Sequence, residues 1–456
     1  SAFLNIFGNP YLSLRGISWL ACITNLLLLY VLCNKFTGRL LSLGCTAFYA
    51  GLYLVNSLSI QGRGYTLAIT FYLISLLMLY EICVNRKNHV IYYALFSLSL
   101  TWGLYTITSN LYWVLPTCFV GGFYLLFQKD FPRLIRLIIS SVIAALHTFG
   151  LYTLIWLAIG SNLLSKTADS GFYGIYQVTI ILKAPLKAFL TGMNYMLASP
   201  YVQSMDREIV IRDFFPWLTG LLDQFVISSG KLTLYLLFFF LLLHLFLAVL
   251  ALLRKNRIAL FFHSYASITL IMVPMILIIQ SVQPYHRVFT FFGITMAITF
   301  FTPILWKGEK PTGFSCEAAK DGNFSLPKLG NLILCLLFLG FCCFNLFSSY
   351  YRAPYADRES KIKEILQQSE MAEEIDKICF LDDYQKYVLQ FYYDIRPTEA
   401  SLPEADFLLV PTEILQPDYT AKVWPILYTY EEIDWEALKN YQAVTETEDY
   451  IFYRKK

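Results

Sequence analysis

Six polar residues lie at the edges of long apolar runs, where a charged side chain is costly unless it has a task. They are Arg15, Gln61, Arg63, Tyr65, His286 and Arg287. An arginine at a bilayer boundary can bind a phosphate through two parallel, charge-assisted hydrogen bonds. The phosphate at that depth belongs to a lipid headgroup, so these residues are candidates for binding an anionic lipid. The alternative is that each arginine only extends towards ordinary phospholipid.

Other reactive residue types form no recognisable catalytic or metal-binding pattern. The ten cysteines include no CxxC pair, which predicts neither a metal site nor a disulfide framework. His147 and His244 lie inside apolar runs, where a lone histidine usually hydrogen-bonds a neighbouring helix. Three carboxylates lie in the long loop at about 160–230, where solvated loop charge is the default explanation and a catalytic role is the alternative: Asp206, Glu208 and Asp213. We therefore assign no catalytic residue.

Membrane helices must position these residues. The 456-residue chain is 57% hydrophobic and 15% charged, whereas soluble domains carry about 25% charged residues. A bilayer core needs about 20 apolar residues in a helix. Ten runs qualify: 16–33, 40–58, 65–82, 90–107, 111–127, 134–159, 231–253, 259–280, 288–306 and 329–348. The net charge of +3 is too small to indicate a nucleic-acid partner.

Lysine and arginine gather in alternate loops between these runs. One set of loops contains Lys35, Arg39, Arg86, Lys87, Lys129, Arg133, Arg254, Lys255, Arg257, Lys307, Lys310, Lys320 and Lys328. The short loops of the other set contain only Arg63 and Arg287. Because cytoplasmic loops are enriched in cations, the first set is assigned to the cytoplasm. Both chain ends and the loop at about 160–230 then lie outside a plasma membrane that the chain crosses many times.

Two segments outside the membrane spans are expected to form helices, and the tail is expected to form a domain. Residues 209–228 and 180–197 mix apolar and charged residues, as in helices that lie in the membrane interface. This loop is either an ordinary cap or a lid over a lipid-facing cavity. The tail at 350–456 alternates helix and strand patterns, which favours a small α/β domain. Its expected helices are Asp357–Ile375, Asp383–Tyr393 and Asp434–Tyr441, and its expected strands are Ile378–Leu381, Asp406–Val410, Val423–Tyr428 and Tyr450–Tyr453.

The sequence thus predicts an all-α polytopic bundle of about ten helices over 1–348 and an extracytoplasmic α/β domain over 350–456. The tail has no histidine and no Gly-rich phosphate loop. Its titratable groups, besides lysine and arginine, are carboxylates, tyrosines and Cys379. A structural or acceptor-docking role is therefore favoured over catalysis for this domain.

Several ordered segments carry a resemblance to a known family. They are Leu14-Arg15-Gly16-Ile17-Ser18, Leu29-Tyr30-Val31-Leu32, Phe36-Thr37-Gly38-Arg39, Asn56 to Leu67 with Arg63-Gly64-Tyr65 inside, Thr101 to Thr106, and Pro284-Tyr285-His286-Arg287. In this order they resemble GT-C type membrane glycosyltransferases related to dolichyl-phosphate-mannose–protein mannosyltransferases. Val288 follows Arg287 where the family usually has tyrosine.

The resemblance implies an inverting transfer of a sugar from a polyprenyl-phosphate carrier to a glycan, lipid or protein acceptor at the outer membrane face. A carboxylate would deprotonate the acceptor hydroxyl. Arg63 and Arg287, with His286 as a weaker candidate, would stabilise the leaving phosphate, and Tyr65 would line the pocket. The family carries its catalytic acid in a first outer loop that would precede Ser1, so we expect an N-terminally truncated chain. No cofactor is predicted, and the sequence leaves open the sugar, the acceptor and a divalent-metal requirement.

Two rival functions stay open from the sequence. A polymerase or ligase of lipid-linked glycans would also have many spans and a large outer loop, with its arginines around 160–230. A transporter or flippase would show internal repeats and broken spans near the midplane. The sequence shows no such symmetry.

Overall fold

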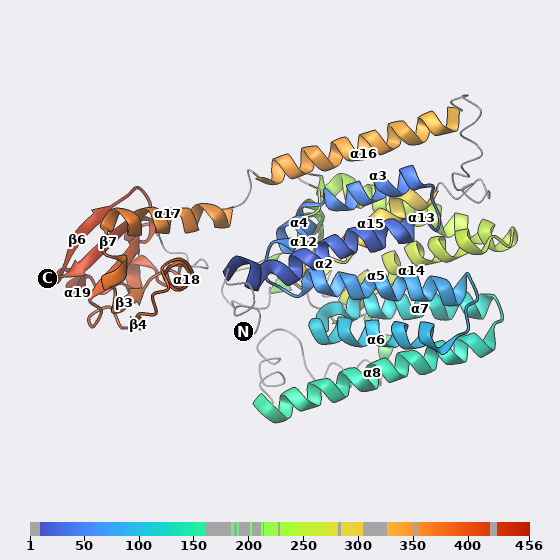
Figure 1. Cartoon of the computed structure of the whole chain (residues 1–456), viewed down its shortest axis with the longest axis horizontal. Coiled ribbons are helices and arrows are strands. Elements are labelled where there is room, and N and C mark those ends of the chain that lie inside the picture. Colours follow the sequence, from blue (N-terminus) through green and yellow to red (C-terminus); the bar gives the residue numbers. More distant parts are fainter. Residues whose placement is uncertain are drawn as a thin grey trace. The chain divides into compact units, whose positions relative to one another are not determined.

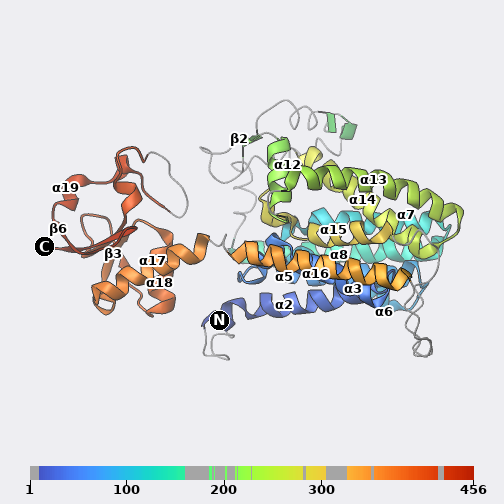
Figure 2. The same cartoon turned by 90° about the horizontal axis from the view of Figure 1, so that it is seen from above.

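The computed structural model describes residues 10–159, 184–186, 189–190, 201–202, 211–212, 214–226, 229–280, 284–303, 326–350, 354–419 and 426–456. The chain is mostly helical and divides into two compact units, Ser1–Ser348 and Ser349–Lys456. Figures 1 and 2 show the helices of unit 1 and the small sheet of unit 2.

Unit 1 is a helical bundle. Its helices are α2 (Pro10–Cys33), α3 (Arg39–Ala50), α4 (Tyr53–Ser59), α5 (Tyr65–Cys83), α6 (Val90–Thr106), α7 (Leu111–Phe127), α8 (Phe131–Ile159), α12 (Phe214–Asp223), α13 (Gly230–Leu253), α14 (Arg257–Gln280), α15 (Phe292–Phe301) and α16 (Leu326–Tyr350). Short 3-10 turns, η1 (Thr108–Asn110) and η2 (His286–Phe289), precede α7 and α15, and β1 (Tyr201–Val202) pairs with β2 (Ile211–Arg212).

Within the described residues, seven helices are long and apolar enough to cross a membrane, or eight if the bent pair α3–α4 is one span. Unit 1 is therefore a multi-pass membrane bundle. The ten apolar runs expected from the sequence coincide with helices, but 40–58 is divided between α3 and α4, α6 has 17 residues and α15 has 10, so the expected count of about ten spans is not confirmed. Helix α12 lies within 209–228, where a helix in the membrane interface was expected, and most of 180–197 lies outside the described residues.

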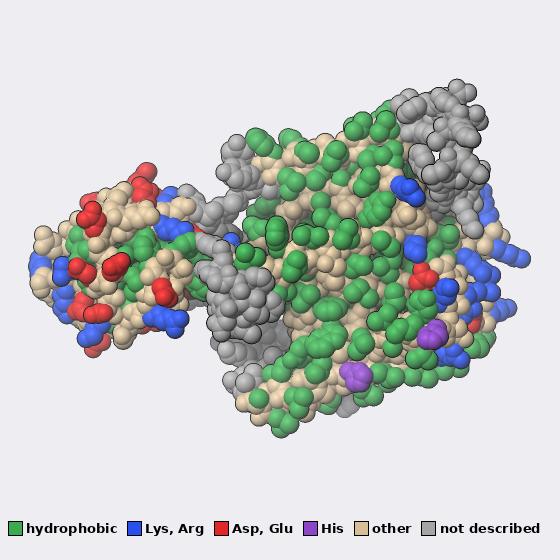
Figure 3. All heavy atoms as spheres, in the orientation of Figure 1, with side chains coloured by type: hydrophobic (Ala, Val, Ile, Leu, Met, Phe, Trp, Pro, Cys, Tyr) green, Lys and Arg blue, Asp and Glu red, His purple; other side chains and the backbone are tan. Residues whose placement is uncertain are grey.

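Among the described residues, the basic loops around Lys35, Arg86, Lys129 and Arg254 gather at one end of unit 1, which we call the basic end. Lys35 Nζ lies 3.1 Å from Glu81 Oε1, and Arg133 donates to the Ile82 carbonyl at 3.2 Å. Arg136 donates to Asn88 Oδ1 at 2.6 Å. Figure 3 shows the lysines and arginines concentrated there, next to a largely hydrophobic flank. The opposite end, where α5 and α15 begin, is called the distal end.

The span α3–α4 is broken by a bend of 71° between Ala50 and Tyr53. A break frees backbone groups that the membrane core cannot hydrate. Here Tyr53 N donates to the Phe225 carbonyl at 3.0 Å, and Leu54 N donates to the Gln224 carbonyl at 2.8 Å. The buried Asn345 side chain of α16 donates to the Gly51 carbonyl and, at 3.3 Å, to Phe225. The turn after α12 and one α16 amide therefore complete the broken span.

Helix α16 packs on α3 through two small residues spaced by seven. A Cβ added to Gly44 would lie 3.3 Å from Cys335 Cα, and one added to Gly51 would lie 2.6 Å from Cys342 Cα. Equal spacing on both helices means that they run in parallel with a coiled-coil-like repeat. Between these steps, the Phe48 ring stacks on Phe341 with centroids 5.4 Å apart. Small residues allow close packing where no hydrophobic effect drives helix association.

Unit 2 is an α/β domain with a five-stranded sheet of order β4-β3-β5-β7-β6. Its elements are α17 (Pro354–Ser369), η5 (Ala372–Glu374), β3 (Lys377–Phe380), α18 (Asp383–Tyr392), β4 (Thr398–Glu399), β5 (Phe407–Pro411), η6 (Thr412–Leu415), η7 (Tyr430–Glu432), α19 (Trp435–Leu438), β6 (Tyr441–Glu446) and β7 (Tyr450–Lys455). Strand β3 is parallel to β4 and β5, whereas β7 is antiparallel to β5 and β6. Alternate β3 residues enter two apolar cores, one on each face.

Most tail elements expected from the sequence are present, with two differences. The strand expected at Val423–Tyr428 is not formed in its described part, where Ile426 makes a single bridge to Asp382. Strands β4 and β6 were not expected: both residues of β4 are exposed, and only the first residue of β6 is buried. Exposed edge strands carry little of the hydrophobic pattern by which a strand is recognised.

The parallel α3–α16 packing predicts a specific cross-link. The Cβ position of Gly44 lies 3.8 Å from Cys335 Cβ, close to the mean separation in disulfides, about 3.8 Å. We expect Gly44→Cys to form a disulfide with native Cys335 under mild oxidation, detected as a linked peptide by mass spectrometry. Gly122→Cys, where an added Cβ has no neighbour within 4 Å, is the matched control. A Gly44→Cys chain that links elsewhere would contradict the packing.

The hydrogen bonds of Asn345 to the broken span predict that removing its side-chain amide lowers the stability of the protein. Asn345→Leu leaves the Gly51 and Phe225 carbonyls with fewer donors, so the free energy of unfolding should fall by about 1–3 kcal/mol. Unfolding in mixed micelles measures this change. Asn331→Leu, on the same helix, should change stability by less than about 0.5 kcal/mol, since Asn331 forms no hydrogen bond with the described residues. Equal effects of the two variants would contradict the capping role.

Candidate functional site

The turn that carries Arg63 is fixed by its backbone. Ser18 Oγ, on α2, donates to the Arg63 carbonyl at 3.1 Å, and Arg63 N donates to the Gln61 carbonyl at 2.7 Å. Gln61 Nε2 donates to Ser57 Oγ at 3.2 Å. The Arg63 side chain is exposed. A rigid main chain with an exposed guanidinium suits a group that must bind an anion without reorganising.

Helix α2 holds the start of α5 in place. The buried Asn25 amide donates to the Thr66 carbonyl at 2.9 Å and accepts from Thr70 Oγ1 at 2.7 Å. Arg15 lies three residues before Ser18 on α2, which places the two residues on the same face of the helix. Tyr65, the first residue of α5, is partly buried against the main core.

His286 and Arg287 lie in η2, between α14 and α15. The Arg287 guanidinium carbon lies 4.4 Å from the centre of the Tyr285 ring, a cation–π contact. The His286 ring packs against Trp217 of α12, with ring centroids 5.9 Å apart. The Arg287 carbonyl accepts from Thr290 Oγ1 at 2.6 Å. Arg287 itself is half-buried, so its cation meets less water than that of Arg63.

The two arginine-bearing segments belong to neighbouring elements at the distal end. The ring of Tyr72, on α5, contacts Phe291 at the start of α15 with centroids 6.1 Å apart. A Cβ added to Gly293 would lie 3.1 Å from Leu52 and from Val55. Helix α5, two turns after its start, and Val55 of α4 thus both pack against the start of α15.

Three distal residues were missed as site candidates from the sequence. Trp217 of α12 contacts η2. Lys231, exposed at the start of α13, adds a cation. Asp223 Oδ1 accepts from Gly230 N at 2.6 Å, and it is the one carboxylate at the distal end among the described residues of unit 1. Asp206, Glu208 and Asp213 lie outside the described residues. The one sequence signal for Trp217 and Asp223 is that both lie in the same amphipathic segment.

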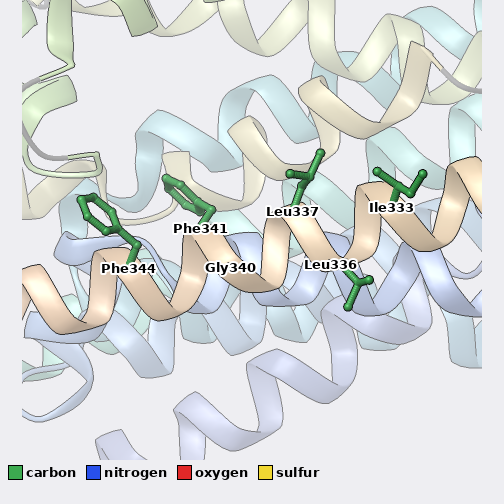
Figure 4. A pocket seen from close by; sticks show the side chains of 6 residues that line it. All are labelled: Ile333, Leu336, Leu337, Gly340, Phe341 and Phe344. Atoms are coloured by element: carbon green, nitrogen blue, oxygen red, sulfur yellow. The ribbon is translucent and has the colours of Figure 1, made fainter.

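Two hollows lie on the flank of the bundle rather than at this end. One, of about 580 Å³, follows α16 and is lined by Ile333, Leu336, Leu337, Gly340, Phe341 and Phe344. Figure 4 shows four of these side chains directed to one side of α16 and Leu336 to the other. The second, of about 350 Å³, lies between α6 and α8 and includes His147. Their linings suit lipid contact more than chemistry.

The two intramembrane histidines differ from each other. His244 hydrogen-bonds neighbouring helices as expected, with Nδ1 2.9 Å from His263 Nδ1 and Nε2 2.9 Å from the Thr299 carbonyl. Because a carbonyl only accepts, His244 must donate from Nε2, and His263 must donate to His244. This contact joins α13, α14 and α15. His147 instead is exposed on α8 and has no hydrogen bond to the described residues, so the expectation is wrong there.

The charged groups at the centre of unit 2 bind one another and so hold the domain together. Asp382, fully buried after β3, accepts from Arg358 Nη1 at 2.9 Å, Tyr450 Oη at 2.8 Å and Tyr384 N at 2.8 Å. Burial, followed by the Asp382 charge, raises the pKa of Tyr450 well above its usual value. Arg358 also binds Glu413 at 3.0 Å. These groups bind one another, and among the described residues no cluster of three His, Cys, Asp or Glu could hold a metal ion.

Comparisons with known proteins add no assignment. The chain matches no protein-family model, no curated protein and no solved structure.

Cys379 gives a direct check on the tail. Burial, followed by the Glu399 charge, raises the pKa of its thiol to about 11. At pH 8 the thiolate fraction, and so the alkylation rate, should be about 100-fold lower than in the unfolded chain, where the pKa is about 9. Mass spectrometry after iodoacetamide treatment, with and without denaturant, measures the ratio. A reactive Cys379 in the folded protein would contradict its buried place in β3.

Proposed function

We propose that this chain is a plasma-membrane glycosyltransferase that moves a sugar from a polyprenyl-phosphate carrier to an acceptor hydroxyl at the outer face. The observation that carries the proposal is the placement of Arg63 and Arg287 in two short turns. They lie on neighbouring elements at the distal end, whereas the loops at the other end contain most cations of unit 1. If the basic end faces the cytoplasm, the distal end and unit 2 face outward.

The distal residues would act on the leaving group. As the bond from sugar to phosphate breaks, negative charge grows on the lipid phosphate. Arg63 and Arg287 would bind its oxygens, with His286, Gln61 and Arg15 at its margin and Tyr65 beside the lipid or the sugar. Fixed donors aimed at developing charge accelerate such steps because they need no reorganisation. A carboxylate would remove the proton from the acceptor hydroxyl, and the residue that does so is unassigned.

Arginine is well suited to binding a phosphate at the membrane boundary. A guanidinium presents several donors in a plane and stays charged at all physiological pH values. The two sites differ usefully, since Arg63 is exposed and Arg287 is half-buried beside Tyr285. Arg63 would meet the headgroup first, and Arg287 would hold it in a drier position where each hydrogen bond is stronger.

A transporter is the second candidate, because one observation favours it. Span α3–α4 is broken, as are many helices at the substrate sites of transporters. The two functions separate experimentally: sugar transfer persists in detergent solution, whereas transport requires sealed vesicles. A glycan polymerase or ligase would place its arginines in the segment 160–230, most of which lies outside the described residues.

The proposal predicts that each distal arginine matters and that an arginine at the basic end does not. Transfer of sugar from radiolabelled polyprenyl-phosphate sugars to an acceptor hydroxyl by the full-length protein in detergent should fall on the order of 10²-fold in Arg63→Ala and in Arg287→Ala. Arg257→Ala, an exposed arginine at the basic end, should retain full activity. In the same variants, affinity for a polyprenyl monophosphate should fall about tenfold or more. Equal behaviour of all three variants would remove the assignment.

A further inference from the structure

Helix α12 covers the η2 turn along two of its successive helical turns. Trp217 is completely buried, and its Nε1 donates to the Pro284 carbonyl at 3.3 Å. Its ring lies 5.9 Å from that of His286 and 5.6 Å from that of Phe289. One turn further along α12, a Cβ added to Gly220 would lie 3.5 Å from His286 Cε1. A helix of the long outer loop thus forms one wall of the turn that carries Arg287.

The η2 turn needs such support. A 3-10 turn of four residues has poorer hydrogen-bond geometry than an α-helix. Two main-chain bonds and one side-chain bond close it: Val288 N donates to the Tyr285 carbonyl at 3.0 Å, and Thr290 donates to the Arg287 carbonyl from N at 3.3 Å and from Oγ1 at 2.6 Å. The Trp217 bond to Pro284 enters just before these residues. It therefore fixes the main chain from which Tyr285 and Arg287 project.

Helix α12 is itself anchored at its other end. The carbonyls of Gln224 and Phe225, directly after α12, accept from Leu54 N and Tyr53 N of the broken span. Asp223 also holds Gly230 N at the start of α13. Glycine is required at that position, since an added Cβ would overlap the Thr219 carbonyl oxygen. Helix α12 can therefore transmit the rigidity of the bundle to η2.

We infer that Trp217 is a positioning residue for the anion site: it holds residues 284–287 so that the Arg287 guanidinium is presented to a lipid phosphate before the ligand arrives. This inference rests on the proposed function, because the ligand is the same phosphate. A preordered cation binds more tightly because less conformational entropy is lost on binding. Trp217 thus contributes to affinity through Arg287 and touches no ligand itself.

Hydrogen exchange tests the first part without any ligand. In Trp217→Ala, amide exchange in the peptide that contains Val288 and Thr290 should rise at least tenfold. Trp217→Phe keeps the ring contacts but loses the bond to Pro284, so its exchange should rise by a smaller factor. Trp19→Ala removes another distal tryptophan, 58% exposed, and should leave this peptide unchanged. Unchanged exchange in Trp217→Ala would overturn the inference.

A double-mutant comparison tests the second part, with a polyprenyl monophosphate in detergent micelles as the probe. Trp217→Phe should weaken its binding about three- to tenfold with thermal stability retained, and Trp217→Ala about ten- to thirtyfold. In an Arg287→Ala background, Trp217→Phe should have no further effect. A merely structural Trp217 would lower stability and leave the affinity of the folded protein unchanged, which would overturn the inference.

Failure of the positioning role of Trp217 can be distinguished from failure of the proposed function. If Arg287→Ala weakens binding but neither Trp217 variant does, positioning by Trp217 is wrong and the proposed function stands. If Arg287→Ala leaves binding unchanged, the phosphate site itself is wrong, and the role of Trp217 in it falls as well, whatever the exchange data show.

Discussion

The need to satisfy backbone groups inside a membrane shapes the distal end of unit 1. The bend between α3 and α4 exposes main-chain groups that lipid cannot hydrogen-bond. The protein supplies partners from far along the chain, with two carbonyls after α12 and one amide from α16. That solution fixes α12 against the bundle, and α12 in turn packs against η2. The placement of His286 and Arg287 thus depends on how a break in another helix is completed.

The sequence predicted most helices of unit 1 because a long apolar run marks them, but its count of about ten spans is not confirmed: seven or eight described helices are long and apolar enough to cross a membrane. It predicted 40–58 as one span, whereas the structure bends it by 71°. Gly51 was the only local sign, and a glycine alone does not reveal whether a distant amide will cap a break. In unit 2, β3 and β5 carry buried apolar residues and were recognised, whereas the exposed edge strand β6 was not. The hydrophobic pattern of a segment predicts a strand only when the strand is buried. Whether a segment is buried depends on partners that are far apart in the sequence.

In the candidate site, too, some residues could be predicted from the sequence and others could not. Arg63 and Arg287 could be selected from the sequence, because a cation at the edge of an apolar run is conspicuous. The residues that orient them could not. Ser18 and Trp217 act through hydrogen bonds to main-chain carbonyls 45 and 67 residues away, and neither residue type reveals such a partner. That Arg63 and Arg287 bind one phosphate is still a prediction, supported by the contacts of α5 and α4 with the start of α15.

The hydrogen bond from Asn345 to the Gly51 carbonyl also bears on biosynthesis. The two residues are 294 positions apart, so a ribosome releases the acceptor long before the donor. Until α16 enters the bilayer, the bend in the second hydrophobic segment lacks its last partner, and the glycine face of α3 is open to lipid. During synthesis the Gly51 carbonyl therefore needs another hydrogen-bond donor until α16 is delivered.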